Sequence, residues 1–127
     1  MTTDPYGVPH AARVSYGALL AVDAGRLRLG LGEGTRSATH LRDSARAALL
    51  FVDPELHLCV KADAVSLPAA PAHPELARFE LQVREVFEAR DDGPEGGTTP
   101  GGLSLGESEE LAAWRERTVR LRRSLAL

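Results

Sequence analysis

The residues best suited to chemistry form a glycine-rich turn that leads into hydroxyl and guanidinium side chains. The turn reads Gly34-Thr35-Arg36-Ser37, within the run 29–41. Glycine lets the backbone turn closely, and free backbone amides at the start of a helix attract anions. The hydroxyls of Thr35 and Ser37 and the guanidinium of Arg36 could add charge-assisted hydrogen bonds to a phosphate. The pattern indicates an anion site, although similar turns also serve as plain helix caps.

Five β-strands are expected to position this turn, because short apolar segments alternate or run continuously between turn formers. They cover residues 11–22, 26–31, 47–52, 56–65 and 78–88. Gly17 interrupts the first strand, as at a bulge or a close approach. The turn 23–25 makes a hairpin with Gly25 where positive φ is tolerated. The continuous run 47–52 is typical of a strand covered on both faces, and a phase change predicts a bulge near Arg84.

The other elements are short or lie near the C-terminus. A helix over 37–43 is expected, capped by Thr35 or Ser37. The turn formers at 4–9 leave only three residues before them for a first strand. We expect one domain over 1–127, with barrel strands in 1–90, a flexible Gly/Pro loop over 91–106 and a helix over 107–125. The strand succession suggests a closed or nearly closed antiparallel barrel.

Composition excludes several classes of function. A formal net charge of −3 gives no attraction to nucleic acid or to an anionic membrane. No apolar run approaches the roughly 20 residues that span a bilayer. No export signal is expected, because residues 1–5 lack a charged region followed by an apolar stretch. The single cysteine, Cys59, rules out an internal disulfide and suits the cytoplasm. No metal site is expected, because the four histidines do not lie at metal-ligand spacings.

Two segments resemble the pyridoxamine 5′-phosphate oxidase-like, FMN-binding split-barrel family. Residues 4–16, beginning Asp4-Pro5-Tyr6-Gly7-Val8-Pro9, resemble its first hairpin, and residues 35–51 resemble its turn, helix and following strand. The resemblance covers roughly residues 4–88 in the right order. It implies a mainly β fold: an antiparallel split β-barrel with a short helix after the second hairpin and a C-terminal α-helix. It also implies a homodimer with two FMN sites at the subunit interface.

The resemblance assigns candidate cofactor-binding residues by position. Those on the ring or ribityl side are Arg13, Val14, Ser15 and Tyr16, and those on the phosphate side are Thr35, Arg36 and Ser37. The lysine with which the family binds phosphate falls on Ser37 here. Loss of one charge-assisted contact costs about 1.5–3 kcal/mol.

The implied activity is that of a flavin-dependent oxidoreductase acting on a small molecule. The C-terminal residues 120–125 lack the arginine-leucine-alanine-proline ending of true pyridoxamine phosphate oxidases, so vitamin B6 oxidation is not expected. No residue is singled out as a catalytic acid or base. Two alternatives remain open: a non-catalytic protein that binds flavin, the deazaflavin F420 or haem, and a degenerate barrel that has lost its ligand.

Overall fold

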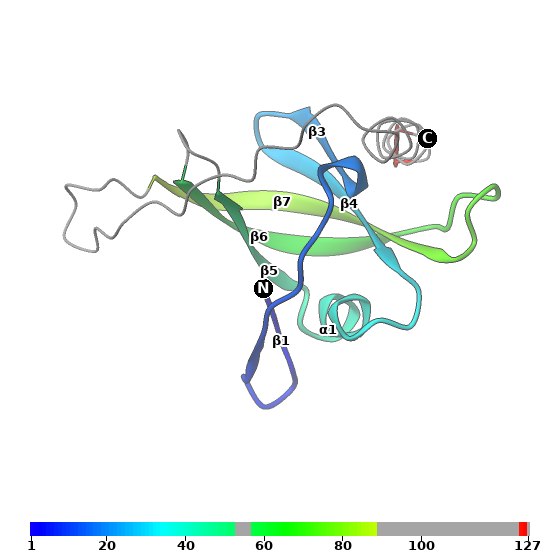
Figure 1. Cartoon of the computed structure of the whole chain (residues 1–127), viewed down its shortest axis with the longest axis horizontal. Helices are drawn as coiled ribbons and strands as arrows, with labels where there is room; N and C mark the ends of the chain where they lie inside the picture. The colour runs from blue at the N-terminus through cyan, green and yellow to red at the C-terminus, as the bar shows by residue number, and fades with distance from the viewer. Residues whose placement is uncertain (53–56, 89–124, 127) are drawn as a thin grey trace, which may run out of the picture.

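The structure is a computed structural model that describes residues 1–52, 57–88, 125 and 126. Within these residues the chain forms a five-stranded antiparallel sheet, a two-stranded hairpin and one α-helix (Figure 1). The expected loop over 91–106 and nearly all of the expected helix over 107–125 lie outside the described residues. No helix in the described part of the chain is both long and apolar enough to cross a bilayer.

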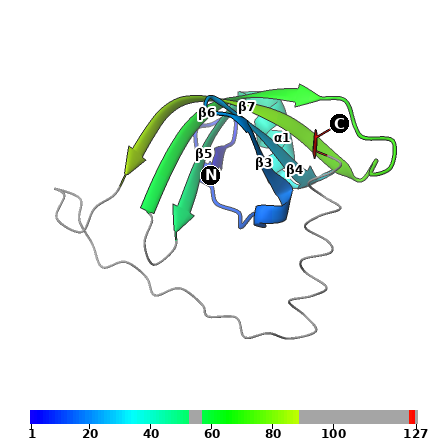
Figure 2. The ribbon, with the colours of Figure 1, turned by 90° about the horizontal axis from the view of Figure 1, so that it is seen from above.

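The elements follow one another along the chain as short strands around a single helix. They are β1 (Thr2–Thr3), β2 (Pro9–His10), the 3-10 helix η1 (Tyr16–Ala18), β3 (Leu19–Asp23), β4 (Arg26–Gly32), α1 (Arg36–Ser44), β5 (Arg46–Val52), β6 (His57–Leu67) and β7 (Leu76–Glu88). The large sheet has the order β3-β4-β7-β6-β5. It arches, with the segment that carries η1 beneath it (Figure 2). The edge strands β3 and β5 do not pair in the described residues, so the observed fold is mainly β and antiparallel without a closed barrel.

The core lies between α1 and the inner face of the sheet. Alternation along β4, β6 and β7 directs every second side chain toward α1. The buried cluster consists of Leu29, Ala38, Leu41, Ala62, Ala64, Ala77, Phe79 and Leu81. In β7 the expected bulge is confirmed: Lys61 pairs with Glu85 and Ala62 with Val83, which leaves Arg84 as the extra residue.

The expectation of one long strand over 11–22 is wrong in its first two thirds. Only Leu19–Asp23 is a strand, and Tyr16–Ala18 is a 3-10 turn. The Ser15 hydroxyl accepts a hydrogen bond from the Gly17 amide, and the Ser15 carbonyl accepts one from the Ala18 amide. Such local bonds from serine compete with strand pairing. Gly17 therefore belongs to a turn and not to a strand bulge.

The hairpin turn at 23–25 is confirmed, but its mechanism differs from the expectation. Gly25 does not have positive φ. Instead the Asp23 carboxylate accepts hydrogen bonds from the Gly25 amide at 3.0 Å and from the Arg26 guanidinium at 2.8 Å. The bond from Arg26, followed by the bond from Gly25, lowers the pKa of Asp23. The turn is thus closed by a side chain.

The strand β5 is not covered on both faces, in contrast to the expectation for 47–52. Ala47 and Leu49 pack against the core. Leu50 and Val52 on the other face are 61% and 50% exposed. The continuous apolar run therefore marks an edge strand whose outer face lacks a protein layer in the described part of the chain.

The N-terminal hairpin is confirmed, with a first strand of two residues. The Asp4 carboxylate accepts hydrogen bonds from the amides of Tyr6 and Val8. Gly7 has φ +82°, which glycine adopts without strain. The Met1 carbonyl accepts a hydrogen bond from the Ala48 amide, so the hairpin is attached to part of the free edge of β5.

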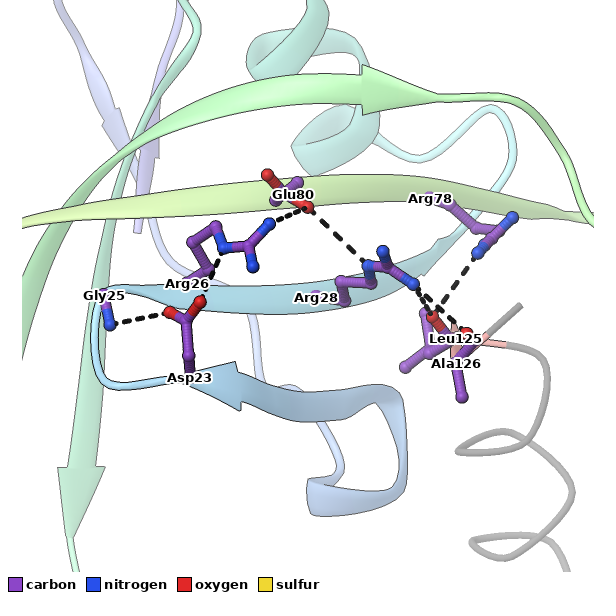
Figure 3. A network of polar contacts seen from close by, with 8 residues as sticks. All are labelled: Asp23, Gly25, Arg26, Arg28, Arg78, Glu80, Leu125 and Ala126. Atoms are coloured by element: carbon purple, nitrogen blue, oxygen red, sulfur yellow. Dashed lines mark hydrogen bonds and ion pairs between the residues drawn. The ribbon is translucent and has the colours of Figure 1, made fainter.

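Arginines on the outer face of β4 and β7 bind the C-terminal main chain (Figure 3). Arg28 donates to the carbonyls of Leu125 at 3.0 Å and Ala126 at 3.3 Å. The buried Arg78 donates to the carbonyls of Leu125 and Pro68. Lys, Arg and His side chains commonly satisfy the last carbonyls of a chain segment in this way. These guanidinium groups therefore have a structural role and are not available as an anion site.

Replacing Ala45 by glycine is expected to stabilise the protein. Ala45 ends α1 with φ 55°, in the left-handed region. A non-glycine residue there costs about 1–2 kcal/mol, part of which is offset by the greater freedom of glycine in the unfolded chain. We expect a gain of about 0.5–1 kcal/mol in urea unfolding. Ala47→Gly, in β5, is the control and should destabilise; a loss at both positions would contradict the prediction.

Candidate functional site

A cavity of about 450 Å³ lies between the segment 11–15 and the edge strand β5. Small-molecule sites typically measure about 300–1,000 Å³. The lining residues are Met1, Ala11, Ala12, Arg13, Val14, Ser15, Leu19, Ala48, Leu49, Leu50, Phe51 and Val52. One wall is thus the irregular segment 11–15, and the other is β5.

The walls of this cavity are mostly apolar, with polar groups on one side only. Leu19, Leu49 and Phe51 are half-buried, and Val14 is 39% exposed. Arg13 and Ser15, with exposed side chains, supply a charge and a hydroxyl on the 11–15 side. An apolar cleft with a few polar groups is the usual form of a site for a small organic ligand.

Three of the four candidate ring-side residues therefore line one cavity. Arg13, Val14 and Ser15 do so from an irregular segment and not from the expected strand. Tyr16 begins η1. The opposite wall is not indicated by the sequence, because the continuous apolar run 47–52 predicts a strand covered on both faces. Only the sheet order shows that this strand lies at an edge.

The phosphate-side turn has the expected local structure. Gly34 has φ +81°, and Thr35 is the N-cap of α1. The Thr35 hydroxyl donates to the Gly32 carbonyl at 2.9 Å and accepts from the Ala38 amide at 3.3 Å. Of the two caps considered, Thr35 is the one used, and its hydroxyl is already engaged in holding the turn.

Arg36 and Ser37 lie on different sides of the first turn of α1. The Arg36 side chain is exposed and makes no ion pair within the described residues. Ser37 is buried and lines a small hollow of about 20 Å³ together with Val14 and Leu49. Val14 and Leu49 also line the large cavity, so the hollow that contains Ser37 adjoins it. Thr35 and Arg36 line neither space.

The carboxylate of Glu33, which directly precedes the turn, is neutralised by Arg42. Arg42 makes a two-pronged ion pair with Glu33, with N–O separations of 2.6 and 2.7 Å. The hydrogen bond from Arg42 lowers the pKa of Glu33 below its ordinary value. Glu33 is therefore ionised at neutral pH, and the pair leaves Arg36 as the net positive charge at this turn.

Two histidines come together away from this cavity. His10 and His40 have ring centroids 5.6 Å apart in an edge-to-face arrangement, and the Thr2 hydroxyl lies 3.0 Å from Nδ1 of His40. The contacts join the N-terminal hairpin to α1. In the described residues no group of three or more His, Cys, Asp or Glu side chains gathers around a point that could hold a metal. Cys59 lies half-buried within β6.

Comparison with known proteins leaves the chain without an assigned family. No protein-family model matches the sequence, and no curated protein matches it significantly. Any functional assignment therefore rests on the residues themselves and on the geometry of the cavity.

Proposed function

We propose that this protein binds flavin mononucleotide in the cavity between residues 11–15 and β5, as a homodimer of the split-barrel class. The observation that carries the proposal is the convergence of Arg13, Val14 and Ser15 on one cavity of about 450 Å³. These are the residues that the resemblance assigns to the flavin ring and ribityl chain. The arched antiparallel sheet and the short helix after the second hairpin agree with that fold class.

The cavity suits the flat ring of a flavin. Leu19, Leu49 and Phe51 offer an apolar wall, against which an aromatic ring system gains free energy by leaving water. Arg13 and Ser15 provide donors at one side for the polar edge of the ring or the ribityl hydroxyls. The residues present therefore fit this part of the cofactor.

The phosphate of FMN has fewer candidate partners than the flavin ring. The Thr35 hydroxyl is occupied by the cap, and Ser37 is buried beneath the helix start. Arg36 remains as a charged donor, supported by the positive end of the nine-residue helix α1. Phosphate binding would thus rest on one guanidinium and on main-chain amides.

The homodimer is supported by the exposed outer face and free edge of β5. Leu50 is 61% exposed and Val52 is 50% exposed. Unpaired strand edges are normally protected in native proteins. A two-fold partner would cover this strand and complete the open side of the cavity, which gives two equivalent sites per dimer.

The redox chemistry would belong to the flavin, which supplies hydride and electron transfer when bound. The described lining contains no carboxylate or imidazole. The chain's own part is to exclude water with its apolar wall and to orient the ring with Arg13 and Ser15. An oxidoreductase acting on a small molecule is the proposed activity. The lack of an acid or base in this lining favours, as second candidate, a flavin carrier without turnover.

Arg36→Ala tests the phosphate contact. FMN affinity is expected to fall by about ten- to a hundredfold, because one charge-assisted hydrogen bond is lost. Riboflavin, which lacks the phosphate, should bind the variant and the parent protein equally. Quenching of flavin fluorescence measures both affinities, and Arg26→Ala on β4 is the control for lost positive charge. Equal losses for FMN and riboflavin would show that Arg36 is structural only.

A further inference from the structure

A second cavity lies next to the first one, under the N-terminal hairpin. It measures about 390 Å³ and shares Met1 and Ala48 with the cavity described above, whereas its charged side chains line the second cavity alone. Its walls are Met1, Thr2, Thr3, Pro9, Arg46, Ala47, Ala48, Lys61, Ala62, Asp63, Arg84 and Glu85. Ala62 and Ala64 face the core, so Lys61 and Asp63, which alternate with them, face outward into this space.

Three neighbouring strands bring three cations to this cavity. Arg46 lies on β5, Lys61 on β6 and Arg84 at the bulge of β7. Arg46 pairs in register with Asp63, and Lys61 pairs with Glu85. A bulge can change the direction of a side chain. Arg84, the extra residue of the bulge, contacts the Asp63 carboxylate on β6 through its Nε.

The two carboxylates of the lining are engaged by two of these cations. Arg84 contacts Asp63 through Nε, and its guanidinium has five N–H donors in all. Lys61 stands 3.7 Å from Glu85, which is an ion pair without a hydrogen bond. Arg46 has no carboxylate within ion-pair distance in the described residues. The side chains of the lining, three cations and two carboxylates, therefore carry one net positive charge in a chain whose formal net charge is −3.

Small apolar groups complete the cavity. Pro9 and Ala48 contribute apolar surface beside the charged side chains. An anion with a compact apolar body would place its charge among Arg46, Lys61 and Arg84 and its body against the hairpin. A fully hydrated ion would leave that apolar surface unused.

We propose that this cavity is a second ligand site, which binds a small organic anion, a phosphate or carboxylate on a compact apolar body, with Arg46 as its main anchor. The site adjoins the flavin cavity through Met1 and Ala48, but none of its charged side chains lines that cavity. Asp63 and Glu85 compete with the ligand for the cations. Removal of either carboxylate therefore raises the affinity for the anion, and removal of the Arg46 guanidinium lowers it. These opposite signs, together with a saturable response, distinguish a binding site from a solvated charged surface.

The test uses the full chain, labelled with nitrogen-15, and follows backbone amide signals during titration with phenyl phosphate, benzoate and the neutral benzyl alcohol. Saturable shifts are expected at the amides of Arg46, Lys61 and Arg84 with the anions and not with the alcohol. Comparison of phenyl phosphate with benzoate shows which anionic group the site prefers. Arg46→Gln should weaken anion binding by about tenfold or more. Asp63→Asn should raise the affinity for the anion.

The matched control is Arg26→Gln, which removes the same charge at an exposed site on β4, away from the cavity. It should leave the anion affinity unchanged. Thermal unfolding of each variant checks that the fold is kept, and Lys61→Gln replaces Arg46→Gln if the latter fails to fold. The proposal is overturned if the shifts appear elsewhere, if Arg26→Gln weakens binding as much as Arg46→Gln, or if Asp63→Asn weakens it.

Discussion

Replacing Phe79 by alanine is expected to cost about 3–5 kcal/mol of unfolding free energy, the usual range for a buried phenylalanine. Phe79 is 1% exposed near the start of β7 and belongs to the core cluster under α1. The guanidinium carbon of Arg42 lies 5.9 Å from its ring centroid. A cavity at this place would loosen the contact between the helix and the sheet. Urea unfolding followed by circular dichroism measures the loss.

Phe87→Ala is the matched control, because it removes the same side chain from the same strand. Phe87 is 44% exposed and lies beyond the bulge at Arg84. Its loss should cost much less than that of Phe79, since less apolar surface returns to water. Equal costs at the two positions would mean that the core does not lie where the structure places it.

Filling the cavity is expected to have the largest effect on ligand binding. Val14 lines both the large cavity and the small hollow beside Ser37. Val14→Trp places an indole in the space assigned to the flavin ring. We expect the affinity for FMN and for riboflavin to fall by about tenfold or more, because the indole and the flavin ring compete for the same space; tenfold corresponds to about 1.4 kcal/mol. Fluorescence quenching measures both ligands.

Val22→Trp provides the control for this change. Val22, on β3, is 38% exposed, close to the 39% of Val14, and lines none of the cavities described above. It should leave flavin affinity and stability unchanged. If both tryptophan variants bind flavin as the parent protein does, the ligand does not occupy the cavity between residues 11–15 and β5.

Features governed by local chemistry could be predicted from the sequence. The hairpin at 23–25, the Thr35 cap and the bulge at Arg84 each depend on a few neighbouring residues. Turn formers, capping hydroxyls and a break in alternation report such features directly. The antiparallel, mainly β class followed from the same signals.

Features that depend on contacts between distant segments could not be predicted. One local feature was also not predicted: the hydrogen bond from the Gly17 amide to the Ser15 hydroxyl forms a turn where the sequence pattern indicates a strand. The apolar run of β5 has the same pattern whether a second layer covers it or not, and only the sheet order shows that it is an edge. The cavity and the charged site beneath the hairpin both arise where residues near the N-terminus meet β5.

Titration of the nitrogen-15-labelled protein with FMN tests the central claim most directly. We predict saturable shifts of the amide signals of residues 11–15 and 48–52, which form the two walls of the large cavity. The signals of Arg36 and Ser37 should shift with FMN and much less with riboflavin. No saturable shift, or shifts confined to residues outside these walls and the start of α1, would contradict the assignment of the flavin to this cavity.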